Sequence, residues 1–282
     1  AFRPKVFNYH HYVIHRSLEK VTSYLPCTHI LYDQIVGSLG ADLNFFHTEY
    51  CFNMLMEESE DVLNQNKIKE IKKKSVISLG GYTNKINSEN KYDKFTFIYN
   101  HRLDGYKNWQ ITFNQFDQLW NEGFDFQVIL TAGDKDNINT INKKPYCVVK
   151  SFTKHKDYLK ELARCHCNTI NSRHETYCIS VAESIMNEQI TILPNRCTFP
   201  ELVGDNYPYL FKDLDSQLEM LRNIIKNNIK SYDYKTKNKL TLNSHVEVIN
   251  DLFIKLCTPE KNNVFDSIKK QKSKNEIKKY LS

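Results

Sequence analysis

Several features of common protein classes are scarce or absent in this sequence of 282 residues. No apolar run approaches the ~20 residues that a membrane-spanning helix needs, and no basic-then-apolar leader opens the chain. Glycine is scarce, at 8 residues, and the sequence has neither a Gly-x-Gly-x-x-Gly motif nor a Walker loop. These absences exclude a membrane span and disfavour a nicotinamide-dependent enzyme or a P-loop nucleotidase.

Paired cysteine spacings are also absent, although the chain has 8 cysteines. A chain of this length needs no cross-links to bury a core, so we expect a reducing, cytoplasmic compartment, or the host cytoplasm if a phage encodes the chain. The triplet Cys165-His166-Cys167 is too closely spaced for the usual zinc site, and no second pair follows. We therefore expect no metal and interpret the triplet as a helix end that enters a strand.

The composition allows a packed core, since 40% of the residues are hydrophobic and 12% are aromatic. The formal net charge is +6, from 39 basic and 33 acidic residues, which is compatible with an anionic ligand but far from a polycation. The Lys-rich tail after residue 261 fits either a solvated helix or a contact with a nucleic-acid backbone. The chain opens at Ala1 without an initiator Met, which is compatible with a fragment of a longer protein.

Residues 94–194 alternate regularly between two kinds of pattern. Short apolar runs predict strands at residues 95–99, 126–130, 146–151, 168–171 and 189–193. Between them, apolar stripes of helical period predict helices at residues 109–122, 154–163 and 179–186. This alternation predicts a parallel sheet with helices on both faces, which binds ligands at the carboxyl ends of its strands.

The regions on either side of this alternation are less regular. Strands are expected at residues 5–9, 41–47 and 75–79, and helices at residues 28–39 and from residue 49. The basic run at residues 67–74 is interpreted as a lead into the third strand, and the polar stretch at residues 82–92 as a linker. Residues from 213 onward have helical periodicity.

The loop at residues 100–108 follows a predicted strand and holds two cations, Arg102 and Lys107. Two fixed cations at that edge of a sheet suit a diphosphate, because the guanidinium makes two-pronged contacts and the ammonium acts as a point charge. Gly105 permits a tight turn. An ordinary solvated loop with surface cations explains the same residues equally well.

The loop at residues 174–178 also lies between a strand and a helix. Unpaired N–H groups at residues 178–180 would open that helix and attract phosphate, with help from the helix dipole. Glu183 lies about one turn inside the helix, where its carboxylate can accept two ribose hydroxyls, and Glu175 can contact a sugar. The alternatives are a dipole-complementing acid for Glu175 and a solvent-facing charge for Glu183.

Two glutamates separated by seven residues, after a strand and together with the two earlier cations, resemble the family-4 retaining glycosyltransferases of the GT-B fold. The sequence is most similar to the tRNA-queuosine mannosyltransferase-like group, and phage nucleobase glycosyltransferases fit the same pattern. The resemblance covers residues 95–211 and extends weakly upstream through Tyr9-His10-His11. The residues that carry it are Asn100-His101-Arg102, Lys107-Asn108, His174-Glu175, Glu183 and residues 193–202.

The resemblance implies an α/β, GT-B-like fold in three parts. Residues 1–91 form a shortened, acceptor-side Rossmann-like domain. Residues 92–230 form the doubly wound parallel-sheet domain that binds a nucleotide sugar, and residues 231–282 are helices that pack back on the domains. The amino-terminal part is short for this fold, because two Rossmann-like domains normally face each other across a cleft.

The resemblance also assigns site residues. Arg102 and Lys107 would hold the donor diphosphate and stabilise the leaving group. Glu175 would bind the transferred sugar and Glu183 the donor ribose. His10 would be the amino-terminal histidine that faces the sugar, with His11 as the alternative. The other residues expected at the donor are His174, Tyr177, Cys178 and Ile179.

The implied reaction is transfer of a hexose, with retention, from a UDP- or GDP-linked donor such as UDP-glucose or GDP-mannose. Neither a metal nor an enzyme nucleophile is expected, and the departing phosphate oxygen would take the acceptor proton. The favoured acceptor is a modified nucleobase in DNA or tRNA, which in DNA requires base flipping. One departure concerns the donor site, because the family usually has Gly where Cys178 stands.

Three alternatives remain open from the sequence. The enzyme could act on a glycan, a lipid or a protein instead. The chain could be a non-catalytic subunit that binds a nucleotide sugar and regulates a partner. It could also be a nucleic-acid-binding module without transfer chemistry, whose binding would be salt-sensitive and indifferent to nucleotide sugar.

Overall fold

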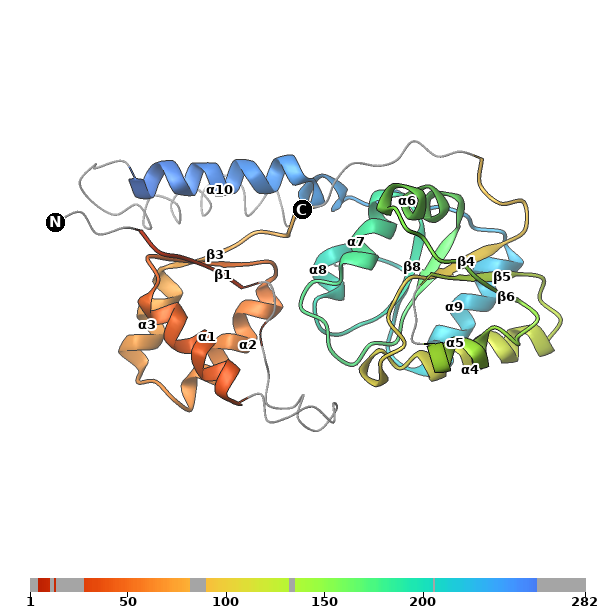
Figure 1. The fold of residues 1–282 in the computed structure, drawn as a ribbon, viewed down its shortest axis with the longest axis horizontal. Coiled ribbons are helices and arrows are strands. Elements are labelled where there is room, and N and C mark those ends of the chain that lie inside the picture. The colour runs from red at the N-terminus through yellow and green to blue at the C-terminus, as the bar shows by residue number, and fades with distance from the viewer. Residues whose placement is uncertain are drawn as a thin grey trace.

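The computed structural model describes residues 5–10, 13, 28–81, 90–131, 135–204 and 206–257. These residues form two parallel sheets, of three and six strands, toward opposite ends of an elongated molecule (Figure 1). We call residues 5–81 together with helix α10 the three-stranded half, and residues 90–240 the six-stranded half. His11 and most of the expected linker lie outside the described residues.

The three-stranded sheet has the order β1-β2-β3, and both neighbouring pairs are parallel. Its strands are β1 (Phe7–His10), β2 (Leu43–Phe46) and β3 (Ser75–Ile77), and the helices between them are α1 (Thr28–Gly40), α2 (Glu49–Glu60) and α3 (Gln65–Lys73). Side chains alternate along β2, so Phe46 packs with α1, α2 and α3 while Leu43 and Phe45 face the other way. Both faces of the sheet are therefore apolar and need cover.

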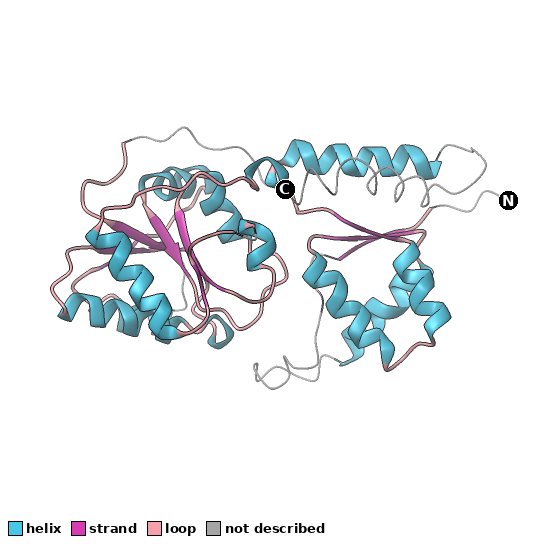
Figure 2. Ribbon diagram, turned by 180° about the vertical axis from the view of Figure 1, so that it is seen from behind, coloured by secondary structure: helices cyan, strands magenta, loops and turns pink. Residues whose placement is uncertain are grey.

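Helix α10 (Leu242–Cys257) covers the second face of the three-stranded sheet, the one opposite α1–α3. It follows the six-stranded half in sequence and lies across the three-stranded sheet, opposite the α1–α3 layer (Figures 1 and 2). Leu252 is buried against the apolar side chains of β2 and β3, and the Phe253 ring stacks on Phe7 with centroids 4.0 Å apart. The last described helix therefore ties the two halves together.

The six-stranded sheet has the order β6-β5-β4-β7-β8-β9, and every neighbouring pair is parallel. The strands are β4 (Thr96–Tyr99), β5 (Gln127–Leu130), β6 (Cys147–Val149), β7 (Cys167–Thr169), β8 (Ile190–Pro194) and β9 (Leu210–Phe211). The helices are α4 (Trp109–Asn121), α5 (Lys135–Ile141), α6 (His155–Arg164), α7 (Ile179–Met186), α8 (Phe199–Val203) and α9 (Leu214–Lys226), with short 3-10 turns at η2 (Gly105–Lys107) and η3 (Lys237–Leu240).

Helices cover both faces of this sheet. Phe97 and Tyr99 of β4 join a core with α4 and α9, whereas Ile98 between them packs against α6 on the other face. Strands buried on both faces read as continuous apolar runs, as β4 does. After α4, Gly123 adopts φ +86° and its N–H donates to Trp120 O at 3.0 Å, which ends the helix where the sequence predicts.

The predicted alternation of strands and helices is confirmed, with some differences. The basic run at residues 67–74 is mostly helix α3, because Ile68 and Ile71 lie three residues apart and are buried together. Helices α5 and α8 and strand β9 were not predicted. The divisions at residues 91/92 and 230/231 stay predictions. Among the described residues, no helix is both long and apolar enough to cross a bilayer.

Candidate functional site

The order of the six-stranded sheet creates a place where its connections diverge. The chain leaves β4 toward β5 on one side and leaves β7 toward β8 on the other, although β4 and β7 are neighbours. Open parallel sheets bind ligands outside the carboxyl ends of strands at such a switch point. The loop at residues 100–108 follows β4 and the loop at residues 170–178 follows β7. The sheet therefore brings together the two segments that the sequence singles out.

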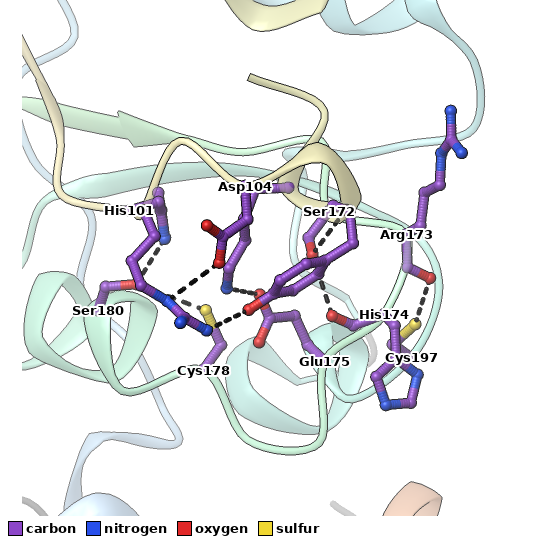
Figure 3. A network of polar contacts seen from close by, with 12 residues as sticks. His101, Asp104, Ser172, Arg173, His174, Glu175, Cys178, Ser180 and Cys197 are labelled. Atoms are coloured by element: carbon purple, nitrogen blue, oxygen red, sulfur yellow. Dashed lines mark hydrogen bonds and ion pairs between the residues drawn. The ribbon is translucent and has the colours of Figure 1, made fainter. Parts of the chain in front are cut away.

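Lys107 and Glu175 form the charged centre of this crevice, and Figure 3 shows Glu175 within its network of polar contacts. The Lys107 ammonium donates to Glu175 Oε1, and each side chain is only 10% exposed. Burial lowers the pKa of Lys107, but neighbouring groups, Glu175 among them, raise it by more, so its pKa lies above the usual value. Burying both charges has a high desolvation cost, which makes such a pair weak evidence for a stabilising role. The solvated-loop alternative is wrong for Lys107.

Arg102 lies at the rim of the crevice, and its side chain is 72% exposed. Its Nη2 donates to Tyr106 Oη at 2.8 Å, and its Nε lies 3.3 Å from Asp104 Oδ2. Contacts within its own loop therefore hold the guanidinium. The structure brings the two predicted cations to one cavity, with Lys107 inside and Arg102 at the mouth.

Two cavities adjoin at the start of α7. The Lys107 cavity, of about 330 Å³, is lined by Asn100, His101, Arg102, Tyr106, Lys107, Glu175, Thr176, Tyr177, Cys178, Ile179 and Ser180. The Glu183 cavity, of about 510 Å³, is lined by Asn100, Thr131, Phe152, Lys154, His155, Tyr158, Ile179, Ser180 and Glu183. They share three lining residues, and each has a volume within the usual range for small-molecule sites. All the lining residues belong to the six-stranded half.

Glu183 is buried, at 4% exposure, and both of its carboxylate oxygens have partners. The Tyr158 hydroxyl donates to Oε2, and His155 Nε2 lies 3.2 Å from Oε1. The solvent-facing alternative for Glu183 is therefore wrong. The carboxylate is held in place on the wall of its cavity, as a group that accepts hydroxyl donors must be.

A chain of hydrogen bonds runs from the Glu183 cavity to the Lys107 cavity. Asn100 Nδ2 donates to Tyr158 Oη at 2.8 Å, and Asn168 Nδ2 donates to Asn100 Oδ1 at 2.9 Å. His101 Nε2 lies 3.2 Å from Asn168 Oδ1, and His101 Nδ1 lies 2.7 Å from Ser180 Oγ. An amide oxygen only accepts, so His101 Nε2 carries the proton and Nδ1 accepts from the Ser180 hydroxyl. We call these five residues the polar relay.

His101 is 3% exposed, so it is a buried histidine and not a surface one. Burial, with the Lys107 charge as the smaller cause, lowers the pKa of His101 to about 3. The imidazole is therefore neutral at pH 7, which keeps the donor and acceptor directions of the polar relay fixed.

Cys178 stands at the start of α7 in left-handed backbone, with φ 65°. Residues with a side chain are disfavoured in this backbone region. That is a physical reason why the glycosyltransferase family that the sequence resembles has Gly at this position. The N–H groups of Val181 and Ala182 both donate to Cys178 O, whereas those of Ile179 and Ser180 have no acceptor within the helix. Burial, followed by the Glu175 charge, raises the pKa of the Cys178 thiol to about 12, so the thiol stays protonated.

The other residues predicted at the donor lie differently. Ile179 is 44% exposed and lines both cavities. Tyr177 lines the Lys107 cavity, but its hydroxyl donates to Gly80 O, in the three-stranded half, at 2.5 Å. His174 points away from Glu175 (Figure 3), and its ring lies 6.5 Å from that of Tyr50. Of this group, His174 alone is not among the described residues that line the cavities.

The structure does not bring His10 to these cavities. It is 3% exposed, and Ser38 Oγ of α1 lies 3.0 Å from its Nε2. Its ring stacks on Phe46 with centroids 4.4 Å apart. Burial lowers the pKa of His10 to about 4, against a smaller raising effect of Asn44. His10 thus belongs to the core of the three-stranded half, and not to the position facing a sugar that the resemblance assigns to it.

Two histidines that the sequence did not single out lie where the halves meet. The Tyr9 hydroxyl lies 2.9 Å from His47 Nε2 and 3.2 Å from His245 Nε2. The His47 ring stacks on Tyr177, with centroids 4.8 Å apart and an interplanar angle of 21°. His47 directly follows the buried strand β2, just as the loop that holds Arg102 follows β4. Its place at the end of a strand was the sequence feature that could have marked it as a candidate site residue.

Cys165-His166-Cys167 connects the end of α6 to β7, as expected. All three side chains are fully buried, and the Thr96 N–H donates to His166 Nδ1 at 2.9 Å. Within the described ranges, no group of three or more His, Cys, Asp or Glu side chains is arranged to hold a metal ion. The three residues therefore form part of the packed core around the sheet.

Comparisons with known proteins bear on the fold. The sequence matches no protein-family model and no curated protein. The structure is similar to the pneumococcal O-GlcNAc transferase GtfA in complex with UDP and GlcNAc, at 14% identity and TM-score 0.62, over 78% of this chain and 46% of that one. It is similar to HepE of Anabaena in complex with UDP and glucose, at 11% identity and TM-score 0.63, over 88% and 71%. It is also similar to sucrose-phosphate synthase of Thermosynechococcus elongatus, at 11% identity and TM-score 0.66, over 89% and 67%.

The fold is that of the GT-B glycosyltransferases. The expected fold class, an α/β structure with a doubly wound parallel sheet and a smaller amino-terminal unit, is confirmed. At these identities the likeness concerns the fold alone, since unrelated activities share folds. The chain spans about half the length of GtfA and 52% of the chain matched in the GtfA/B complex. The activity of the GT-B chain must therefore be argued from its own site.

Proposed function

We propose that this GT-B chain transfers a hexose from a nucleoside-diphosphate sugar to a hydroxyl acceptor, with retention of the anomeric configuration. The observation that carries the proposal is the buried Lys107–Glu175 pair at the switch point, beside a second cavity walled by Glu183. Two proteins of similar structure were solved with UDP, which makes a UDP-linked donor the first to test and a GDP-linked donor the second.

Each charged group has a separate task in the proposed reaction. The bond between the anomeric carbon and the diphosphate oxygen breaks, and Lys107 stabilises the charge that develops on the leaving diphosphate. Arg102, at the mouth of the same cavity, adds a second cation with a two-pronged donor geometry. The N-terminal amides of α7 add partial positive charge. A diphosphate therefore fits the Lys107 cavity.

The carboxylates recognise hydroxyls. Glu183 accepts hydrogen bonds from the donor ribose, in a position that Tyr158 holds. Glu175 accepts from a hydroxyl of the transferred sugar, while its pairing with Lys107 keeps the ammonium charged. The acceptor oxygen bonds to the anomeric carbon on the face that the diphosphate leaves. The acceptor proton passes to the departing phosphate oxygen, so the reaction needs no metal and no enzyme nucleophile.

The acceptor that we propose is a modified nucleobase in DNA or tRNA. The support is the sequence resemblance carried by Arg102, Lys107, Glu175 and Glu183, together with the net charge of +6. The structurally similar proteins bear names that refer to other substrates, such as O-GlcNAc and sucrose phosphate. A glycan, lipid or protein acceptor is therefore the direct competitor of this proposal.

The test is a transfer assay with UDP-glucose or GDP-mannose in the presence of a chelator. Candidate acceptors are tRNA, DNA containing hydroxymethylated bases, and an oligosaccharide. Nucleotide release and a product mass increased by one hexose, with the NMR signature of a retained anomer, are the expected results. Transfer only to the oligosaccharide overturns the nucleobase acceptor. Donor binding without transfer to any acceptor overturns the enzyme proposal and favours a non-catalytic subunit.

A further inference from the structure

Helix α2 of the three-stranded half lies on the side that faces helix α8 of the six-stranded half (Figure 1), and its first residues contact α8. Glu201 of α8 reaches across the junction. Its Oε2 accepts from the Glu49 N–H at 2.7 Å, and its Oε1 accepts from the Tyr50 N–H at 2.6 Å. Each carboxylate oxygen thus has its own backbone donor, and both donors come from the first turn of α2.

The first turn of a helix leaves four N–H groups without partners in the helix. In α2, the Phe52 N–H makes the first bond of the helix, to Thr48 O at 3.1 Å, and Thr48 Oγ1 accepts from the Cys51 N–H at 3.1 Å. Between Thr48 and Phe52 this leaves the N–H groups of Glu49 and Tyr50, which are those that Glu201 binds. The carboxylate also lies at the positive end of the helix dipole, where an anion is favoured. The N-terminus of α2 is therefore completed by a residue from the other half.

Two more contacts join the same parts of the molecule. The Thr48 hydroxyl donates to Thr176 O at 2.8 Å, and Tyr177 donates to Gly80 O. A Cβ atom on Gly80 would lie 2.3 Å from His47 Nδ1, so this approach requires glycine. Thr176 and Tyr177 stand between Glu175 and Cys178 in the loop that lines the Lys107 cavity. The junction that Glu201 completes thus contacts the loop of the proposed donor site.

We infer that Glu201 is an intramolecular latch, a positioning residue that holds the three-stranded half against the donor site through the N-terminus of α2. This inference rests on the proposed function for its effect on transfer, but not for its effect on the arrangement of the halves. Glu201 lines neither cavity and acts only through α2. The latch sets the position of the acceptor-side half relative to Lys107 and Glu175.

Glu201→Gln is the direct test, because a neutral amide has only one oxygen to accept and presents N–H donors to the other α2 amide. Glu60→Gln is the matched control, since Glu60 is an exposed carboxylate at the far end of the same helix. Small-angle scattering of the ligand-free chain should show a larger radius of gyration for Glu201→Gln than for wild type or Glu60→Gln. An unchanged radius of gyration overturns the latch.

Kinetics separate a latch from a merely structural role. All the lining residues of both cavities lie in the six-stranded half, so UDP affinity of Glu201→Gln should stay within about twofold of wild type while kcat falls by tenfold or more. Equal losses of UDP affinity and kcat would mean that the substitution damages the donor site, and would overturn the inference. If wild type binds no nucleotide, the proposed function fails, and the scattering comparison still decides on the latch.

A second variant tests the same junction from the other side in case Glu201→Gln does not fold. Thr48→Val removes the hydroxyl that accepts from Cys51 and donates to Thr176 O. It should also enlarge the radius of gyration and lower kcat without weakening UDP binding. An unchanged radius of gyration together with full activity in this variant would contradict a role for the α2 N-terminus.

Discussion

The two halves of the molecule share a parallel-sheet design but differ in what they contribute. The six-stranded half has a complete switch point, two adjoining cavities and buried charges that pair across loops. None of the described residues of the three-stranded half lines those cavities. It is attached through α10 and through polar contacts around Thr48, Tyr177 and Glu201. All the residues proposed to bind the donor therefore lie in one half, while the position of the other half depends on α10 and a few hydrogen bonds.

The largest effect is expected at the buried cation. Lys107→Met should lower kcat/KM by about 10²–10³, because it removes charge stabilisation of the leaving diphosphate from a water-excluded site. It should also reduce stability by about 3–5 kcal/mol, because Glu175 is left buried without its partner. Arg102→Met should cost only about tenfold in kcat/KM and little stability, since its side chain is 72% exposed.

The double variant Lys107→Met with Glu175→Gln is the control. It should recover most of the lost stability in urea unfolding, because no unpaired charge stays buried, but it should not recover transfer. A larger loss of transfer from Arg102→Met than from Lys107→Met would reverse the order of the two cations and contradict the assignment of the inner position to Lys107.

The next effect concerns pH and compares histidines of both halves. Burial lowers the pKa of His10 to about 4 and that of His101 to about 3. The unfolded chain, with an ordinary pKa of about 6.5, therefore takes up protons first as the pH falls. The free energy of unfolding should decrease between pH 7 and pH 5, by about 2 kcal/mol for a fully buried histidine such as His101. His101→Gln should flatten this slope in urea titrations, whereas an equal slope in that variant would argue against a neutral, buried His101.

A smaller effect is expected where the polar relay meets Glu183. Tyr158→Phe removes the hydroxyl that donates to Glu183 Oε2, so UDP affinity should fall by about tenfold, the value of one hydrogen bond to a charged group. Tyr146→Phe is the matched control, because its hydroxyl is bonded to Asp117 Oδ1 at 2.7 Å and the residue lines neither cavity. Calorimetry with UDP measures both. Equal losses in the two variants would show that the relay does not act on the donor site.

The smallest effect is expected at the left-handed residue. Cys178→Gly should raise the stability by about 1 kcal/mol, because glycine adopts φ 65° without strain. Cys178→Ala keeps the Cβ atom and should give no such gain. Thermal unfolding of the two variants makes the comparison, and a melting temperature that is lower for Gly than for Ala would mean that the thiol packing outweighs the backbone strain.

Much of the six-stranded half is predictable from the sequence, because most of its strands are short and apolar and the helices α4, α6 and α7 have clear helical periodicity. Rossmann-like topology then fixes which loops meet, so Lys107 and Glu175 come together although 68 residues apart. The missed helix α3 has only Ile68 and Ile71 buried among many lysines, and α8 has five residues. Helices this short offer only a few apolar positions from which a period can be recognised.

The position of His10 is not predictable in the same way. Both faces of the three-stranded sheet are covered, so alternation along β1 does not tell which face meets α1 and which meets α10. The roles of Tyr158 and Glu201 depend on how separate elements dock. A tyrosine on α6 and a glutamate on α8 have no local pattern that reveals a partner on another helix.

The most direct measurement is calorimetric titration of UDP, and then GDP, into wild type and Glu183→Ala without metal. If the six-stranded half carries a donor site, one nucleotide binds to wild type, and Glu183→Ala weakens it by about 100-fold or more through loss of two charge-assisted hydrogen bonds to the ribose. Binding of equal strength in wild type and Glu183→Ala, or no binding of either nucleotide to wild type, would contradict a nucleotide-sugar site at the switch point.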